Sequence, residues 1–214
     1  MKWRTVQITT ASGQASAVAP EIIAASRATD IPAFYAPWFI NRLRAGYARW
    51  INPFNGRPQF VSFANTRVVV FWSKNPRPLL PLLPELEARD LAGYLEFTLN
   101  DYEAEGWEPN LPPIAQRIDT FRRFADAAGP ERVVWRFDPL MLAGHLAQNP
   151  DGCHVLLEKM ASIGKALKGC TRKLVFSFAD IADYRKVREN LRRAGLAWRD
   201  FTQAEMQAVA AGVA

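Results

Sequence analysis

The sequence predicts a mixed α/β fold, in the form of a partial (β/α) barrel with parallel strands inside and helices outside. Five short apolar runs recur along the chain, helical patterns lie between them, and such alternation is typical of βαβ units. The runs are residues 21–25, 67–72, 93–99, 132–137 and 173–178. They are rich in β-branched and aromatic residues and apolar on both faces, as parallel strands covered by helices are.

The helical patterns between these runs have apolar residues spaced three or four apart. The clearest stripe lies between Pro113 and Gly129 and consists of Ile114, Ile118, Phe121, Ala125 and Ala128. Others cover residues 34–43, a short segment after Pro84, and residues 155–167. The alternation of strands and helices is interrupted at residues 47–63, where Asn52 to Gly56 predicts the turn of a hairpin excursion.

Five such units fit either an open doubly wound sheet or part of a barrel of the TIM type. No Gly-x-Gly-x-x-Gly and no Gly-x-x-x-x-Gly-Lys-Ser/Thr fingerprint is present, which favours the barrel. We expect one domain over residues 1–214, with residues 1–20 as an N-terminal strand extension. Thr202 to Glu205 is a capping-box pattern that opens a helix without a stop signal, and a full barrel needs about 250 residues. We therefore expect the barrel to be truncated at its C-terminal side.

The composition suits a globular protein: 49% of the 214 residues are hydrophobic and 22% are charged. No segment has the roughly 18 to 20 uninterrupted apolar residues of a membrane span, and the N-terminus lacks an apolar signal core. We expect a cytoplasmic protein that does not bind membranes. Cys153 and Cys170 form no metal-binding motif, and His145 and His154 are nine residues apart, so no metal site is expected in this chain.

The net charge of +6 points to an anionic partner. We locate the excess late in the chain, on a predicted basic helix over residues 183–194. Its cations are Arg185, Lys186, Arg188, Arg192 and Arg193, with Arg199 shortly after it. Such a helix is either a solvated face or a nucleic-acid-binding surface.

Unusual polar residues follow each predicted strand, where parallel α/β folds bind their ligands. We expect them to meet on one concave rim and to bind a small-molecule or anionic substrate. The catalytic candidates are Arg27, Asp30, Arg136 and Asp138. The candidates for binding a cofactor are Lys74, Asn75, Thr98 and Ser177.

Each candidate also has a structural interpretation. Asp30 and Asp138 precede Ile-Pro and Pro, where a carboxylate commonly organises a turn. Arg136 lies between Trp135 and Phe137, so its charge needs a partner, for which Asp138 or Asp30 is the natural choice.

The strand-end motifs resemble those of the DUF1848 family, a bacterial family without an assigned function. The resemblance covers roughly residues 20 to 200. It rests first on five segments in order, which are residues 26–35, Asn52-Pro53-Phe54-Asn55, residues 71–76, Phe97-Thr98-Leu99 and residues 135–139. The stretch at residues 176–187 resembles the family as well. Members of that family are regarded as similar to radical S-adenosylmethionine enzymes and end in a Cys-x-x-x-Cys-x-x-Cys cluster.

The resemblance implies a radical-type barrel enzyme that binds a [4Fe–4S] cluster and S-adenosylmethionine when intact. This chain lacks the three-cysteine motif, so we expect no cofactor on this chain alone. Two alternatives stay open. One is a cluster-independent barrel lyase or hydrolase that uses Asp30 and Asp138 as acid and base. The other is a nucleic-acid-binding module that uses the helix at 183–194.

Overall fold

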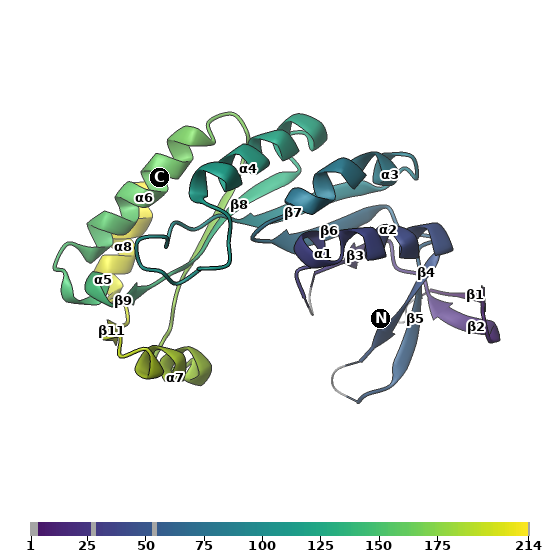
Figure 1. Cartoon of the computed structure of the whole chain (residues 1–214), viewed down its shortest axis with the longest axis horizontal. Helices are drawn as coiled ribbons and strands as arrows, with labels where there is room; N and C mark the ends of the chain where they lie inside the picture. Colours follow the sequence, from purple (N-terminus) through teal and green to yellow (C-terminus); the bar gives the residue numbers. More distant parts are fainter. Residues whose placement is uncertain (1–3, 27–28, 53–54, 214) are drawn as a thin grey trace. The chain divides into compact units, whose positions relative to one another are not determined.

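The structure, a computed structural model, describes residues 4–26, 29–52 and 55–213. The chain divides into two compact units, Met1–Phe97 and Thr98–Ala214, which are described one at a time. Figure 1 shows their elements in sequence colours. Ala214, the predicted end of the last helix, lies outside the described residues.

The first unit begins with a four-stranded sheet in the order β1-β2-β5-β4. Its strands are β1 (Thr5–Thr10), β2 (Gly13–Val18), β4 (Tyr47–Ile51) and β5 (Pro58–Ser62). β1 pairs antiparallel with β2, and β4 pairs antiparallel with β5, whereas β2 and β5 run parallel. The excursion predicted at 47–63 is therefore a hairpin, although Pro53 and Phe54 at its turn lie outside the described residues.

Three parallel strands form the second sheet region of this unit. They are β3 (Ile22–Ala24), β6 (Val68–Ser73) and β7 (Ala92–Thr98), with β6 between the other two. The β-branched run at 68–70 favours the extended backbone of β6.

The helices of the first unit cover one face of these parallel strands. They are α1 (Ile31–Phe34), α2 (Ala36–Ala45), the 3₁₀ helix η1 (Arg77–Leu82) and α3 (Leu83–Glu87). Phe39 of α2 packs edge-on against the buried Phe71, with ring centroids 5.6 Å apart. On the opposite face, Ile22 and Trp72 are 62% and 38% exposed, as expected of a sheet with helices on one side only.

The second unit has two parallel strands and a small antiparallel pair. β8 (Val133–Leu140) pairs parallel with β10 (Leu174–Phe178). β9 (Leu142–Ala143) pairs antiparallel with β11 (Trp198–Arg199).

Five helices accompany these strands within the described part of the second unit. They are α4 (Ile114–Ala128), α5 (His145–Gln148), α6 (Gly152–Ala166), α7 (Arg185–Arg193) and α8 (Gln203–Val213). The predicted capping box is present at α8, because the Glu205 N–H donates to Thr202 Oγ1 at 3.3 Å and the Thr202 N–H to Glu205 Oε2 at 2.8 Å. α8 packs against α6, and the two helices lie next to each other at the left of Figure 1.

The predicted mixed α/β fold with parallel strands and accompanying helices is confirmed in each unit. The predicted partial barrel is not established by these pairings, because the sheets are not closed, and it stays a prediction. Among the described residues, no helix combines the length and the apolar content that crossing a bilayer requires.

Candidate functional site

In the first unit, Asp30 joins the start of α1 to the end of β6. Its Oδ1 accepts the N–H of Ala33 at 3.0 Å and so caps the helix. Its Oδ2 accepts the Ser73 hydroxyl and the Lys74 N–H, both at 3.0 Å. The Asp30 carboxylate therefore has a structural role, because its three hydrogen-bond donors belong to the start of α1 and the end of β6. Its position before Ile-Pro in the sequence indicated only a turn.

The other candidates of the first unit lie directly after β6. Lys74 and Asn75 are half-buried, and the Asn75 N–H donates to the hydroxyl of the buried Ser73 at 3.0 Å. Asp30, Lys74 and Asn75 are thus brought together at one strand end. Arg27, the fourth candidate from this half of the sequence, lies outside the described residues.

In the second unit, three candidates form one polar cluster on β8 and β10. Asp138 accepts the Arg136 guanidinium at Oδ2 and the Ser177 hydroxyl at Oδ1. The side chains of Arg136 and Asp138 are 24% and 23% exposed, so the ion pair is accessible from solvent without being fully hydrated. Asp138 is one of the two partners expected for Arg136.

This cluster lies on the face of β8 opposite the one that α6 covers. Gly164 of α6 comes so close to Trp135 that an added Cβ would lie 3.4 Å from its ring, which places α6 over the Trp135 side of the strand. Because side chains alternate along a strand, Arg136 and Asp138 point the other way. They are therefore not part of the interface between strand and helix.

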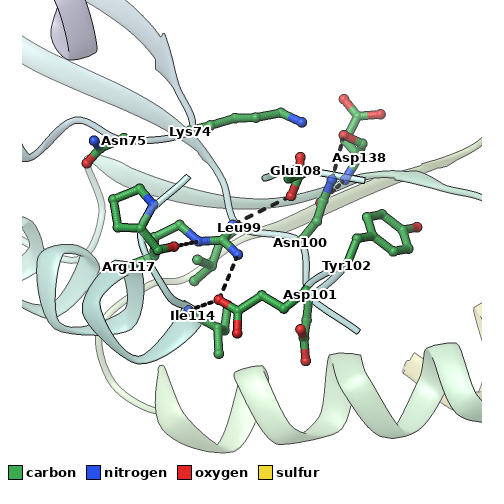
Figure 2. Close-up of polar contacts among 12 residues, drawn as sticks. Lys74, Asn75, Leu99, Asn100, Asp101, Tyr102, Glu108, Ile114, Arg117 and Asp138 are labelled. Carbon is green, nitrogen blue, oxygen red and sulfur yellow. Dashed lines mark hydrogen bonds and ion pairs between the residues drawn. The ribbon is translucent and has the colours of Figure 1, made fainter. Parts of the chain in front are cut away.

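Thr98 is the last residue of β7, Asn100 follows it by two residues, and both lie on the segment next to the cluster. Leu99 donates its N–H to Arg136 O at 2.9 Å, so the chain next to Thr98 runs beside Arg136. The Asn100 side chain is buried and makes two bonds to the backbone of Asp138: Oδ1 accepts the N–H at 2.9 Å, and Nδ2 donates to the carbonyl at 3.3 Å. Asn100 fixes the backbone that presents the carboxylate, and sequence reasoning did not select it. Figure 2 shows this pair.

The segment between β7 and α4, residues 99–113, has no helix or strand and is held by buried polar contacts. The Tyr102 hydroxyl donates to Pro139 O at 2.9 Å and accepts the Met141 N–H at 3.1 Å, and burial raises the pKa of this phenol. Lys159 of α6 donates to both carboxylate oxygens of the buried Glu105 and to Asp101 O, each at 2.8 Å. A loop of this length is usually functional in a compact domain.

Arg117 of α4 is a buried cation that sequence reasoning also missed. Its Nε donates to Pro112 O at 3.0 Å, and its guanidinium lies 3.7 Å from Glu108 Oε2 and 4.0 Å from Glu103 Oε1 (Figure 2). Burial lowers the pKa of Arg117, with the two glutamates opposing this effect. The available signal was its place one helical turn before Phe121, on the apolar face of the helix.

A pocket of about 240 Å³ is formed by residues of the 99–113 segment. It is lined by Tyr102, Glu103, Gly106, Glu108, Pro109, Leu111 and Pro113. None of the predicted site residues lines it, so this pocket and the Arg136–Asp138–Ser177 cluster are separate features.

The remaining titratable side chains offer little for a metal. Within residues 4–26, 29–52 and 55–213, no three His, Cys, Asp or Glu side chains gather in a way that could hold an ion. His145 and His154 lie 3.5 and 3.4 Å from single glutamates, Glu105 and Glu158. Burial, with a contribution from Glu205, raises the pKa of the Cys153 thiol and disfavours the thiolate that metals need.

No curated protein and no solved structure was found to match the chain. A family described as "Domain of unknown function (DUF1848)" matches residues 22–214, which include both groups of candidate residues. The match begins at the first residue of β3 and leaves out only the β1–β2 hairpin and its connection. The chain therefore belongs to the DUF1848 family.

Proposed function

We propose that this chain is the substrate-binding part of a barrel enzyme, and that its substrate is a small molecule with an anionic group. The Arg136–Asp138–Ser177 cluster is the observation that carries the proposal. It lies near the C-terminal ends of two parallel strands, on the face that α6 does not cover, where α/β enzymes keep their reacting groups.

The three side chains have complementary chemistry. The planar guanidinium of Arg136 suits a carboxylate or phosphate of the substrate. Asp138 offers a carboxylate that can act on a proton of a substrate group, and the Ser177 hydroxyl bonded to it can reorient. Asn100 holds the backbone of Asp138 and acts as a positioning residue.

The barrel itself is part of the proposal. In the first unit the helices cover one side of the parallel strands and leave Trp72 and Ile22 exposed on the other, as in one arc of a TIM or radical S-adenosylmethionine-like barrel. Lys74 and Asn75 in the first unit, and Thr98 in the second, stay candidate ligands for a cofactor or substrate.

The resemblance to radical S-adenosylmethionine proteins implies an iron–sulfur cluster, but the described residues do not fit one. Cys153 lies beside Arg199 and Glu205, and Cys170 is on the loop before β10, so these two thiols do not provide the three ligands needed. The proposal for this chain is therefore limited to substrate binding and proton transfer. After anaerobic treatment with iron and sulfide, the 214-residue chain should show no cluster absorbance.

A ligand panel tests the proposed site. Small carboxylates and phosphates are screened by thermal shift against the wild-type chain and against Arg136→Met and Asp138→Asn. We expect at least one anionic class to stabilise the wild type, and Arg136→Met to lose that shift while keeping its own fold. If the anions that stabilise the wild type stabilise Arg136→Met equally, the site lies elsewhere. If none stabilises the wild type, the proposed substrate class is wrong.

The alternative acid–base pair of Asp30 and Asp138 is less well supported. Asp30 accepts three hydrogen bonds that hold α1 and β6 together, so its loss would affect folding before chemistry.

A further inference from the structure

The positive charge of the protein is concentrated in the first unit, which corrects the expectation that its excess lies late in the chain. Met1–Phe97 contains eleven Lys and Arg against six Asp and Glu, a net charge of +5. Thr98–Ala214 contains sixteen against fifteen, a net charge of +1. The first unit also presents most of the large apolar side chains that are exposed in the described part of the chain. Cations and exposed apolar groups together suit a partner that is anionic and also makes apolar contacts.

Three of these exposed side chains are aromatic and lie within five residues, at the junction of α1 and α2. Phe34, Tyr35 and Trp38 are 74%, 49% and 45% exposed. Among the described residues, none of the three rings stacks on another ring or lies under a cation. Aromatic side chains are on average largely buried, so three exposed rings so close in the chain indicate a binding surface.

The backbone that carries the three rings is held in place by the rest of the first unit. Asp30 caps α1 and bonds it to the end of β6. The Phe39 N–H donates to Tyr35 O at 2.9 Å, which joins Tyr35 to the first turn of α2. The inner side of α2 is buried through Ala36, Phe39, Ile40 and Leu43. A scaffold that is fixed before binding lowers the entropy that binding costs.

A cation follows the rings along the same side of α2. Trp38 lies one helical turn after Tyr35, and Arg42 lies one turn after Trp38. Arg42 is half-buried, and within the described residues its buried Nε has no hydrogen-bond partner. The next cation, Arg44, is already paired with Glu85. Because residues 31–84 contain no acidic residue, an anion from outside the chain is the natural partner for Arg42.

We propose that the α1–α2 aromatic surface, which consists of Phe34, Tyr35, Trp38 and Arg42, binds single-stranded nucleic acid. Bases of any sequence stack on exposed aromatic rings, and a neighbouring cation contacts the phosphate backbone. From Tyr35 to Arg42 the helix rises about 10 Å, which suits about three nucleotides at the roughly 3.4 Å spacing of a stacked strand. Duplexes fit less well, because their bases are already stacked on one another.

An anionic membrane fits this surface less well than a single strand does. Polybasic segments that bind anionic lipids have clusters of roughly four to eight Lys or Arg. The α2 helix has two, and Arg44 is the one that is paired. Binding to this surface therefore depends on the rings more than on charge, and stacked bases use ring faces directly.

The basic helix α7 has more cations than α2 but offers less for stacking. It contains five Lys and Arg, and Glu189 lies 2.8 Å from Arg185 and 3.9 Å from Arg193. In the described part of the second unit, Tyr184 is the one large apolar side chain that is exposed. Charge alone would favour α7, whereas base stacking favours the α1–α2 aromatic surface, and the two can be separated by mutation.

Fluorescence anisotropy of a labelled oligo(dT) of about 15 nucleotides, between about 50 and 200 mM salt, tests the proposal. Trp38→Leu should weaken binding about fivefold or more, because it removes one stacked base, and Phe34→Leu should act in the same direction. Trp38→Tyr keeps a ring face and should retain most of the affinity. These variants should leave the salt dependence unchanged, with circular dichroism verifying the fold of each.

Arg42→Gln tests the phosphate contact separately from the stacking. It should weaken binding and lower the slope of log K against log salt by about 0.7, the contribution of one phosphate on a single strand. An unchanged slope would remove Arg42 from the surface and with it the charge argument for a nucleic acid.

The matched control is Tyr184→Leu, which removes an exposed ring beside the five cations of α7. It should change the affinity by less than about twofold. A loss as large as that of Trp38→Leu would assign binding to α7 and overturn the proposal. So would the absence of binding at about 50 mM salt, tighter binding of a duplex of the same length, or equal affinities of Trp38→Leu and Trp38→Tyr. Phosphatidylserine vesicles that bind the wild type but not Trp38→Leu, without binding of oligo(dT), would make the surface a membrane contact instead.

Discussion

The two units use charge in opposite ways. In the first unit most of the cations are exposed, and the Asp30 carboxylate accepts hydrogen bonds at the start of α1 and the end of β6. In the second unit, where charges nearly balance, cations and carboxylates meet in the interior: Lys159 with Glu105, and Arg117 near Glu103 and Glu108. The unit with the smaller net charge therefore has more buried ion pairs than the unit with the larger one.

The difference has a physical cause. A buried ion must be paired and hydrogen-bonded, so the interior charges of the second unit each fix a segment of chain. Together they hold residues 99–113, which carry Asn100 and thereby the backbone of Asp138. Exposed cations need no partner and leave the local fold unaffected, which frees them for binding.

The largest expected effect is the loss of the Glu105 carboxylate. Glu105→Ala leaves Lys159, whose side chain is only 14% exposed, without its counter-charge, and should cost about 3–5 kcal/mol in the free energy of unfolding. Urea denaturation measures this. The double change Glu105→Leu/Lys159→Met should cost less than Glu105→Ala; if it costs more, the pair contributes net attraction and the comparison with the first unit needs revision.

Asn100→Ala should come next. It removes both side-chain bonds to Asp138 and leaves that backbone N–H and carbonyl buried without these partners, at a cost of about 2–3 kcal/mol. Asn100→Ala in the ligand panel should also reduce anion binding at Arg136. An unchanged anion affinity would show that Asn100 stabilises the fold without positioning the site.

Asp30→Ala probes the first unit in the same way. Losing the α1 cap and the bonds from Ser73 and Lys74 should cost about 1–2 kcal/mol, less than Asn100→Ala because the site is nearer to solvent. Asp30→Asn keeps one acceptor oxygen and should recover part of the loss in thermal unfolding. Full recovery by Asn would mean that the charge of Asp30 contributes nothing.

Glu205 gives the second unit a specific response to acid. The hydrogen bond from Arg199, followed by that of the Thr202 N–H, lowers the pKa of Glu205 from 4.5 to about 2. Because the folded-state pKa is the lower one, the stabilisation is present above about pH 4.5 and lost as the pH falls through about 2. Glu205→Gln should cost about 1 kcal/mol at neutral pH and flatten the stability profile across this window. If the free energy of unfolding of Glu205→Gln falls with acid as steeply as that of the wild type, Glu205 is not the group responsible.

The smallest effect is expected for the exposed cations of the first unit. Arg49→Gln/Arg57→Gln should change the free energy of unfolding by less than about 0.5 kcal/mol, because both side chains lie in solvent. Differential scanning calorimetry measures the unfolding of this double variant beside that of Glu105→Ala. A destabilisation above about 1 kcal/mol would mean that the hairpin cations are structural and would remove the contrast between the units.

The elements of the fold were largely predictable because their signals are local. The run predicted at 67–72 is β6 at Val68–Ser73, and the stripe from Ile114 to Ala128 is α4, ending before Gly129 as predicted. The capping box at Thr202 was predictable for the same reason. The division into two units was not, since the composition shows no linker at Phe97 and Thr98.

The candidate site was predictable in residue type and only partly in arrangement. The rule that parallel strands end on one side pointed to Asp138, Ser177 and Arg136, which do meet. The same rule gave Asp30 as catalytic, but the structure gives it three backbone and hydroxyl donors. Whether the two strand-end groups share one rim stays a prediction.

The sequence by itself determined where most of the longer strands and helices lie, how charge is divided along the chain, and the family to which it belongs, since these depend on residues close together or on composition. Only the tertiary structure decided which polar groups meet. Asn100 and Asp138 are 38 residues apart, and Lys159 and Glu105 are 54 apart. Pairing at such distances depends on how strands and helices pack, and no local pattern records it.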